Sequence, residues 1–495
     1  MTSPFSTRVR IYRLLGGPAY LGRQWRMLHR NARLYVISNT LQAATAGAVG
    51  VLYTLYLTAL GYRTDFIGAA LVVATIGGGL GIIPAGPLVR RLGWRTMLIW
   101  SDLIGGVAIA LQIIVPTAPV ILVTMLGVGA SVAIVLVINT PLLAAYSTPR
   151  DRTALFGINN ATNFLAVIIG TLLGGFLPGW FMQREIERSP LLSSLLHPFL
   201  VSGLSARSYE LAMLVSGLVA LPSIIPVLMM RDTTEGPPPP AKELAAAEAA
   251  AVDRSSRIPA AVAVAEKAVQ APVEEKVRDS KIPRRLLQYS GSWLTVLRQN
   301  MAGVTGRFSA TQAVLGFGAG LIFPYVSLYF VNTLGATVRY YGVLSAVLSV
   351  VVALTSLVAA PLAARGGNMR IAIAVQLLSI PFLLTVGVAP WLWLISLAYL
   401  VRGGLMAINN PPLQAFLMEA VEKNQRVLAS SVYNVSYQAS WALGAGVGGW
   451  LITVLGSHLP FLVAALFYAV SALLLLLWFA APAGGAKRRR GKLSK

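Results

Sequence analysis

One arginine lies inside an otherwise apolar stretch of the chain. Arg402 follows about eleven residues of a hydrophobic run at 391–418. A charge at the bilayer centre costs at least ~2.5 kcal/mol on insertion scales, so such a residue is by default a functional candidate. Its planar fork can bind an anionic or hydroxyl-rich group through two parallel hydrogen bonds. The alternative is a structural role, with its donors on backbone carbonyls or a helix end.

Amide and aromatic side chains form a stripe in the run at 428–455. Asn434, Tyr437, Gln438 and Trp441 are spaced i, i+3, i+4 and i+7, so they share one helix face. We expect this stripe to line a substrate cavity. The alternative is hydrogen bonding between helices, worth under ~2 kcal/mol a pair. Six amides elsewhere in the hydrophobic runs are further substrate-binding candidates, although single amides favour the interhelical role: Asn409, Asn160, Asn163, Asn139, Gln42 and Gln312.

The composition is that of a membrane protein. Hydrophobic residues make up 56% of the 495 residues and charged residues only 12%, about half the share of a typical soluble domain. The mean hydropathy is +0.70. The absence of cysteine and the presence of only three histidines argue against disulfides and metal sites. No nucleotide-binding loop of the Gly-x4-Gly-Lys-Ser/Thr type occurs, so ATP drive within this chain is excluded. We expect no catalytic site, no metal and no cofactor.

Hydrophobic runs long enough to cross a ~30 Å hydrocarbon core need roughly 20 residues. Twelve occur, so we predict an all-α membrane protein of twelve transmembrane helices. They run near 34–60, 66–88, 97–115, 118–146, 154–178, 209–230, 308–334, 340–363, 371–388, 391–418, 428–455 and 459–481. The domains follow as a basic N-terminus (1–33), a six-helix bundle (34–230), a cytoplasmic linker with an interfacial helix (231–304), a second six-helix bundle (305–481) and a basic tail (482–495).

The charge distribution predicts the orientation. Lys and Arg concentrate on the cytoplasmic side of membranes. With both termini cytoplasmic, nearly all of the 40 Lys and Arg residues fall on that side, and the outer loops hold only Arg63, Arg184, Arg188, Arg207 and Arg339. The net charge of +23 therefore reads as a topology signal, and we expect no nucleic-acid partner. We expect a monomer in the cytoplasmic (inner) membrane.

The two halves repeat at an offset of 274 residues. Arg33 matches Arg307, and Asn160 matches Asn434. Further pairs at the same offset include Gly61 with Gly335, Gly93 with Gly367, Gly170 with Gly444, Gly174 with Gly448 and Gly175 with Gly449. Six helices, a linker and six related helices form the parallel-repeat plan of secondary carriers.

The loop after the second run resembles a motif of the major facilitator superfamily, Gly-x-x-x-Asp-Arg-x-Gly-Arg. Gly86, Arg91 and Gly93 match it, Arg95 lies one place late, and Arg90 occupies the Asp position. Arg365 and Gly367 are the repeat mates in the second half. The resemblance implies that this loop is a gating element and that the first, fourth, seventh and tenth helices line a central cavity. It places Arg402 at that cavity.

Two glycine-rich stretches and few acids bear on mechanism. Residues 170–175 and 444–449 are rich in glycine, which predicts close helix packing or, alternatively, an antiporter signature. We expect these segments to be the contacts that slide during alternating access. Asp102 lies in the third run, which is peripheral in the resembled fold, so the coupling ion stays open.

The expected function is secondary transport. We predict an active transporter or facilitator that moves a small-molecule substrate through the bilayer by alternating access, with efflux and uptake both open. The alternative is a membrane receptor or scaffold on a transporter fold. Polar side chains in the cavity would favour transport, and a plug of large apolar residues would favour the scaffold.

Overall fold

The computed structural model describes residue 25 and residues 28–147, 152–183, 204–231, 303–422 and 425–479. The chain forms two units, Met1–Arg231 with Gly303–Lys495, and Asp232–Ala302. The second unit contains almost all of the predicted linker and lies outside the described residues, as do most of the predicted basic N-terminus and the tail. All that follows concerns the first unit.

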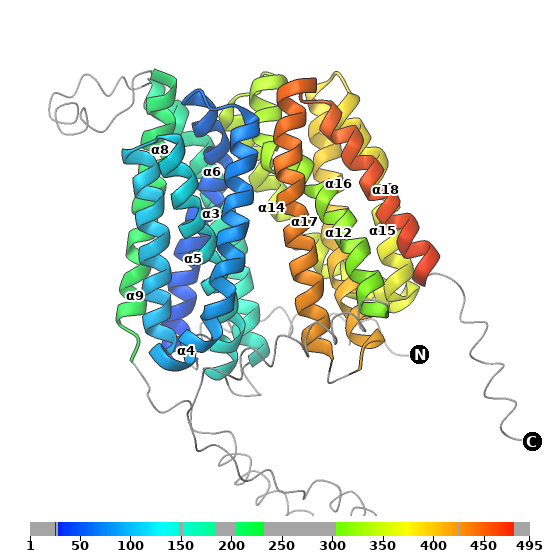
Figure 1. The fold of residues 1–495 in the computed structure, drawn as a ribbon, viewed down its shortest axis with the longest axis horizontal. Coiled ribbons are helices and arrows are strands. Elements are labelled where there is room, and N and C mark those ends of the chain that lie inside the picture. Colours follow the sequence, from blue (N-terminus) through cyan, green and yellow to red (C-terminus); the bar gives the residue numbers. More distant parts are fainter. Residues whose placement is uncertain are drawn as a thin grey trace, which may run out of the picture. The chain divides into compact units, whose positions relative to one another are not determined.

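The described helices form two groups (Figure 1). The N-half contains α3 (Arg30–Ala59), α4 (Thr64–Ile114), α5 (Ala118–Ala145), α6 (Arg152–Gln183), α8 (Leu204–Ala220), η2 (Leu221–Ser223) and α9 (Ile224–Leu228). The C-half contains α12 (Val304–Ile322), η4 (Phe323–Tyr325), α13 (Val326–Leu328), η5 (Tyr329–Thr333), α14 (Val338–Gly366), α15 (Asn368–Val388), α16 (Leu392–Ala420), α17 (Arg426–Leu455) and α18 (Leu459–Phe479). No strand occurs within the described ranges.

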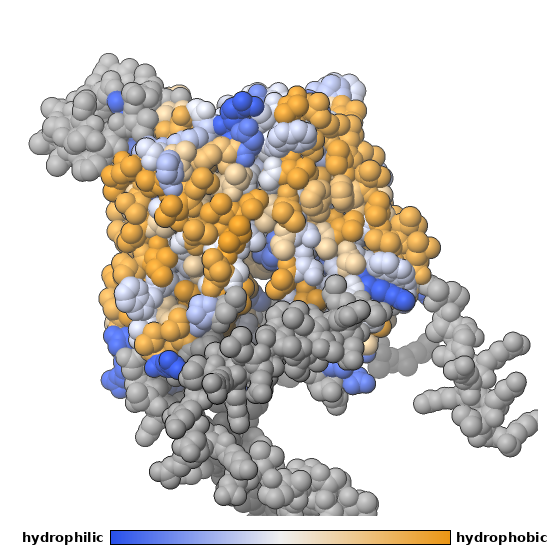
Figure 2. All heavy atoms as spheres, in the orientation of Figure 1, coloured by the Kyte–Doolittle hydropathy of each residue, from blue (hydrophilic) through white to orange (hydrophobic). Residues whose placement is uncertain are grey.

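The predicted twelve spans are confirmed. In the described part of the chain, eleven helical segments are long and apolar enough to cross a membrane, including two within α4. The twelfth span is α17, which has 30 residues but a more polar composition because its first half carries the amide stripe and several serines. Figure 2 shows the matching surface, with apolar residues over the helix sides and polar residues gathered near the helix ends.

Glycines with positive φ mark the tight turns between spans. Gly61, Gly335 and Gly456 have φ of 89°, 69° and 86°, and Gly93 and Gly367 have φ of 82° and 83°. Glycine is favoured in this left-handed region because its backbone carries no Cβ. Antiparallel spans place the first three turns at one end of the helices, called here the Gly61 end, and the other two at the opposite Gly93 end. The repeat mates thus make the same turns at the same ends.

The helices pack in the same order in both halves. In the N-half α3 packs on α6, and in the C-half α12 packs on α17. The glycine-rich stretches take part in these contacts. A Cβ added at Gly170 would lie 1.9 Å from the Ala44 carbonyl oxygen, and one added at Gly444 would lie 2.2 Å from the Phe317 carbonyl oxygen. The glycine-rich stretches are therefore sites of close helix packing, the first of the two predictions for them.

We expect Gly129→Ala to destabilise the protein by about 1–3 kcal/mol, because the added methyl has no room. Its Cβ would lie 1.7 Å from the Ala74 oxygen, where α5 crosses α4. Gly127→Ala on the same helix is the control, since its nearest neighbour, an Ile104 carbon, is 3.4 Å away. Thermal unfolding in detergent should show a loss for the first variant alone. Equal melting temperatures would contradict the packing described here.

The two halves touch each other at the Gly61 end. There α4 packs on α17, and α6 packs on α14. The Thr64 hydroxyl donates to the Gly449 carbonyl (2.9 Å) and lies 2.7 Å from the Thr453 hydroxyl. Two further pairs cross between the halves, with Thr54 and Ser327 hydroxyls 2.6 Å apart and the Arg339 guanidinium 4.5 Å from the centre of the Phe176 ring. The halves are therefore joined at this end by polar and backbone contacts and also by a buried apolar cluster, which contains Leu55 and Ile67 of the N-half and Leu328 of the C-half.

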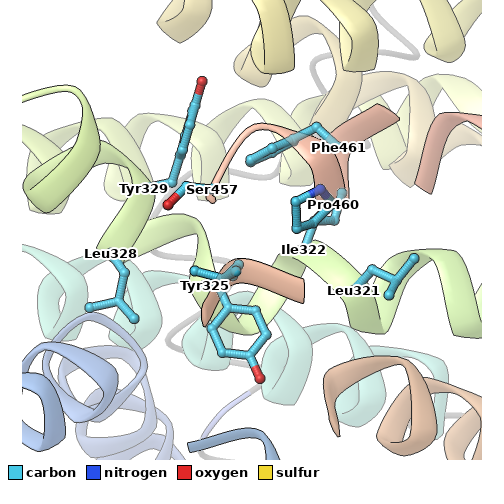
Figure 3. Close-up of a pocket in the computed structure, with 9 residues that line it drawn as sticks. Leu321, Ile322, Tyr325, Leu328, Tyr329, Ser457, Pro460 and Phe461 are labelled. Carbon is cyan, nitrogen blue, oxygen red and sulfur yellow. The ribbon is translucent and has the colours of Figure 1, made fainter. Parts of the chain in front are cut away.

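The Gly61 end of α12 is broken into short turns. Pro324 lies in the break, and the following segment ends as a π-helix. Figure 3 shows Tyr325 and Tyr329 pointing in opposite directions from this segment. Tyr325 donates to the Ala445 carbonyl (2.5 Å) and Tyr329 to the Val386 carbonyl (2.8 Å). The cavity left between them is only about 10 Å³, close to the minimum for one water, so this end is closely packed here.

Candidate functional site

The amide stripe of α17 is divided between a row that contacts α12 and a sector next to the row that contacts α4 of the other half. Tyr437 and Trp441 lie on the row of α17 that meets the glycines of α12. Gly449 and Thr453 lie on a second row that meets α4 of the other half. At 100° per residue, Asn434 and Gln438 fall in the sector between these rows, nearer the Gly93 end. Both side chains are exposed.

The equivalent residue of α6 has the same placement. Asn159 and Gly170 face α3, and Gly175 faces α14 of the other half. Asn160 lies in the sector between these directions and is exposed. Asn160, Asn434 and Gln438 are called the cleft amides below. They lie on two helices of opposite halves, on the Gly93 side of the contacts that join those halves.

Arg402 is buried inside the C-half. It is 2% exposed, and its Cζ lies 5.1 Å from the centre of the Phe323 ring and 4.9 Å from that of Tyr468. Its Nε and Nη2 have no hydrogen-bond partner among the described residues. Phe323 is itself 40% exposed, so the ring that covers the guanidinium on that side lies partly at the surface of the bundle. Arg402 is thus a buried guanidinium that contacts two aromatic rings and has two nitrogens without a partner in the described part of the chain.

Other predicted candidates also lie in the interior of the C-half. The Asn409 amide donates to Gln376 Oε1 at 3.5 Å, and both side chains are fully buried. Gln312 is 2% exposed, and its Nε2 has no partner among the described residues. These two amides therefore lie within the bundle and not in the sector of the cleft amides.

The polar residues of the N-half meet each other. Gln42 Nε2 donates to Asp102 Oδ1 (2.7 Å), and the Tyr35 hydroxyl donates to Asn139 Oδ1 (3.0 Å). Asn163 is partly buried, and its Oδ1 has no partner within the described ranges. Sequence reasoning placed Asp102 on a peripheral helix and missed this contact, because only the packing of the second span of α4 turns the carboxylate towards α3.

The predicted gating residues lie at the Gly93 end. Arg95 Nη2 donates to the Leu228 carbonyl (2.8 Å), which links the start of the second α4 span to the end of α9. Arg91 and Arg365 are exposed beside the two positive-φ glycines, Gly93 and Gly367. Gly86 lies within α4, two turns before the bend. Beside the second turn, Asn368 donates to Glu419 (3.0 Å), which ties α15 to α16.

Fold and site together define a class of protein, a polytopic α-helical carrier built from two six-helix repeats. The sequence matches the profile of the Major Facilitator Superfamily over residues 35–302 and 308–494. The chain belongs to the Major Facilitator Superfamily. No curated protein matches it closely enough to be counted as a relative.

Solved structures share the fold at low sequence identity. A variant of the nucleoside transporter NupG superposes with a TM-score of 0.64 at 14% identity, covering 91% of this chain and 100% of that one. A bacterial homologue of the human lysosomal transporter Spinster, inward-facing and unoccupied, gives 0.64 at 14%, covering 93% and 97%. The xylose transporter XylE from E. coli, inward open, gives 0.59 at 15%, covering 92% and 97%.

Proposed function

We propose that this protein is a secondary carrier that moves a small solute across the cytoplasmic membrane by alternating access. The observation that carries the proposal is the position of the exposed cleft amides. They lie on opposite halves, beyond the contacts that close the Gly61 end. A solute that enters from the Gly93 end meets hydrogen-bonding groups from both halves before it reaches those contacts.

The conformation is then inward-facing. The positive-inside rule puts the Gly93 end in the cytoplasm, because the flanking Arg91, Arg95 and Arg365 are basic. Transport requires the halves to separate at the Gly61 end and to meet at the Gly93 end. The structures of the Spinster homologue and of XylE, described as inward-facing and inward open, are similar in fold.

The substrate class we propose is a polar solute with an anionic or hydroxyl-rich group. The cleft amides offer hydrogen bonds, and Arg402 offers a guanidinium behind the Phe323 ring with two nitrogens that lack a partner among the described residues. Nucleosides and D-xylose, named for two of the similar structures, are reasonable first probes, together with small carboxylates. Influx and efflux are measured separately with right-side-out and inside-out vesicles.

The alternative, a receptor or scaffold on this fold, requires a cavity filled by large apolar residues. The exposed amides support transport. Among the described residues no three of His, Cys, Asp and Glu lie close enough to hold a metal ion. Proton or solute movement, and not chemistry on the solute, is the activity this site suits.

We expect a disulfide between Thr64→Cys and Thr453→Cys to stop transport, because it locks the Gly61 end shut. The two hydroxyl oxygens are 2.7 Å apart across the halves, and the chain has no cysteine of its own to interfere. Solute uptake into proteoliposomes should fall at least about tenfold on oxidation and return on reduction.

The matched control is a disulfide within one half. The Ser101 and Ser131 hydroxyls are 3.2 Å apart, so Ser101→Cys with Ser131→Cys places a disulfide between α4 and α5 without joining the halves. Oxidation of this pair should leave uptake unchanged. Full uptake by the oxidised inter-half pair would overturn alternating access, and no uptake or exchange of any probe by the reduced protein would favour the scaffold.

A further inference from the structure

Asp102 is the acidic residue that lies deepest in the described spans. It follows the Gly93 bend by nine residues and precedes the end of α4 at Ile114 by twelve, which places it near mid-depth. The other described acids lie nearer the helix ends, at Asp65, Glu210, Glu419 and Glu422. A carboxylate at this depth is a functional candidate because its charge is costly in the bilayer.

The contacts of Asp102 leave one oxygen unused. Ser101 faces α5 through Ser131, so the next side chain points into the N-half, towards α3. Oδ1 accepts a hydrogen bond from Gln42 Nε2 at 2.7 Å. Oδ2 is buried and has no hydrogen-bond partner among the described residues. A protonated carboxyl would carry its hydrogen on this second oxygen.

No described cation neutralises Asp102. In the described ranges the ion pair found is Arg63 with Asp65, at the Gly61 end. The titratable group that faces Asp102 is Tyr35 of α3. The other helices packed against this span carry charged residues only near their ends, or carry none within their bounds. Arg30 and Arg33 are in the first turn of α3, and Arg207 and Glu210 are in the first two turns of α8. Helices α5 and α9 have no charged residue, and Arg231 follows α9.

We propose that Asp102 is the proton-binding group that couples transport to a proton gradient. A proton adds to a lone pair of Oδ2, removes the charge, and later leaves to water on the side to which the carrier is open. Tyr35 and Asn139, hydrogen-bonded to each other at 3.0 Å, continue the polar groups towards the Gly93 end. Gln42 joins the carboxylate to α3, a helix that also bonds across the halves through Thr54 and Ser327.

A proton fits this site better than a metal cation. Hard cations bind several oxygen ligands at once. Gln42 presents an N–H to the carboxylate, and the Asn139 oxygen already accepts from Tyr35. Among the described residues, Asp102 Oδ2 is a buried carboxylate oxygen without a hydrogen-bond partner, which suits a single proton. The inference rests on the proposed transport function, so its first test uses no solute.

The first test is infrared difference spectroscopy of the full-length protein in detergent, titrated between about pH 5 and pH 9. The natural chain should show a protonated-carboxyl C=O band that disappears as the pH rises. Asp102→Asn should lack this band, and Asp65→Asn should keep it. Gln42→Met, which removes the bond to Oδ1 and keeps the acid, should shift the midpoint. Absence of any band that depends on Asp102 would overturn the proposal, whether or not transport occurs.

The second test is uptake of the transported probe into proteoliposomes with an imposed pH gradient. The gradient should accelerate uptake by the natural chain and by Asp65→Asn at least about tenfold. Asp102→Asn should lose that acceleration and keep solute exchange without a gradient. Proton coupling at this residue would be overturned if uptake by Asp102→Asn were still fully accelerated by the pH gradient. It would also be overturned if uptake were faster in sodium buffer than in choline buffer and did not depend on pH.

Discussion

Replacing Arg402 with methionine should reduce transport at least about tenfold while leaving the protein nearly as stable as the natural chain. The guanidinium is buried, and two of its nitrogens lack partners among the described residues. A charge-assisted hydrogen bond to a substrate is worth ~1.5–3 kcal/mol, and each 1.4 kcal/mol is tenfold in binding. Loss of that bond accounts for the expected effect on transport.

The stability prediction follows from two opposing magnitudes. Contacts with the Phe323 and Tyr468 rings stabilise the cation by up to about 2 kcal/mol each. Placing the charge in the bilayer costs at least ~2.5 kcal/mol. The two rings together contribute up to about 4 kcal/mol, so the two effects differ by about 1.5 kcal/mol, and methionine should change the unfolding free energy by about that amount or less, which is a few degrees in melting temperature.

Two companion variants make this result decisive. Arg402→Lys keeps the charge but not the planar fork, so transport should stay impaired. Arg307→Met removes an exposed arginine at the start of α12 and should leave transport intact. If Arg402→Met instead lost several kcal/mol of stability and kept full transport per folded molecule, Arg402 would be structural and the substrate role would fail.

Leucine in place of Gly175 should force the Gly61 end open. An added Cβ at this position would lie 2.7 Å from the Gly342 Cα, and one at Gly342 would lie 2.5 Å from the Gly175 Cα. Overpacking costs ~1–3 kcal/mol, and here the cost applies only while α6 and α14 touch. The ratio of open to closed Gly61 ends should therefore rise by about ten- to a hundredfold.

Spin-label distances measure this shift directly, since the chain has no native cysteine. Labels at Arg63 and Asn332 report on the Gly61 end, and labels at Leu92 and Glu422 report on the Gly93 end. The Gly175→Leu variant should lengthen the first distance and shorten the second.

The matched control lies one turn along the same helix. Gly179 has no atom within 4 Å of an added Cβ, so Gly179→Leu should leave both label distances unchanged. Equal distances in all three proteins would show that the Gly175–Gly342 contact does not select the conformation.

Much of the fold was predictable because lipid imposes simple rules on sequence. A span must be apolar and roughly 20 residues long, and its backbone must bond within itself. Those rules gave the twelve helices, and the constant offset of 274 residues gave the two repeats. The α17 span was found despite its amide stripe because the run at 428–455 is still apolar and long enough to cross the bilayer.

The site was less predictable because a helical residue's partner depends on how each helix is rotated. Periodicity placed Tyr437 and Asn434 on one face, but packing against α12 and α4 divides that face and leaves Asn434 and Gln438 exposed. The hydropathy pattern showed that the charge of Arg402 is costly within the bilayer, but it could not show the two aromatic rings that contact the guanidinium.

The sequence by itself determined the number and approximate positions of the spans, because these depend on residues close together in the chain, and the constant offset of 274 residues indicated that the halves are related. Only the tertiary structure decided which polar groups meet. Gln42 and Asp102 are 60 positions apart, and Thr64 and Thr453 are 389 apart. Their contacts depend on helix rotation and on the conformation of the two halves, and no local pattern encodes either.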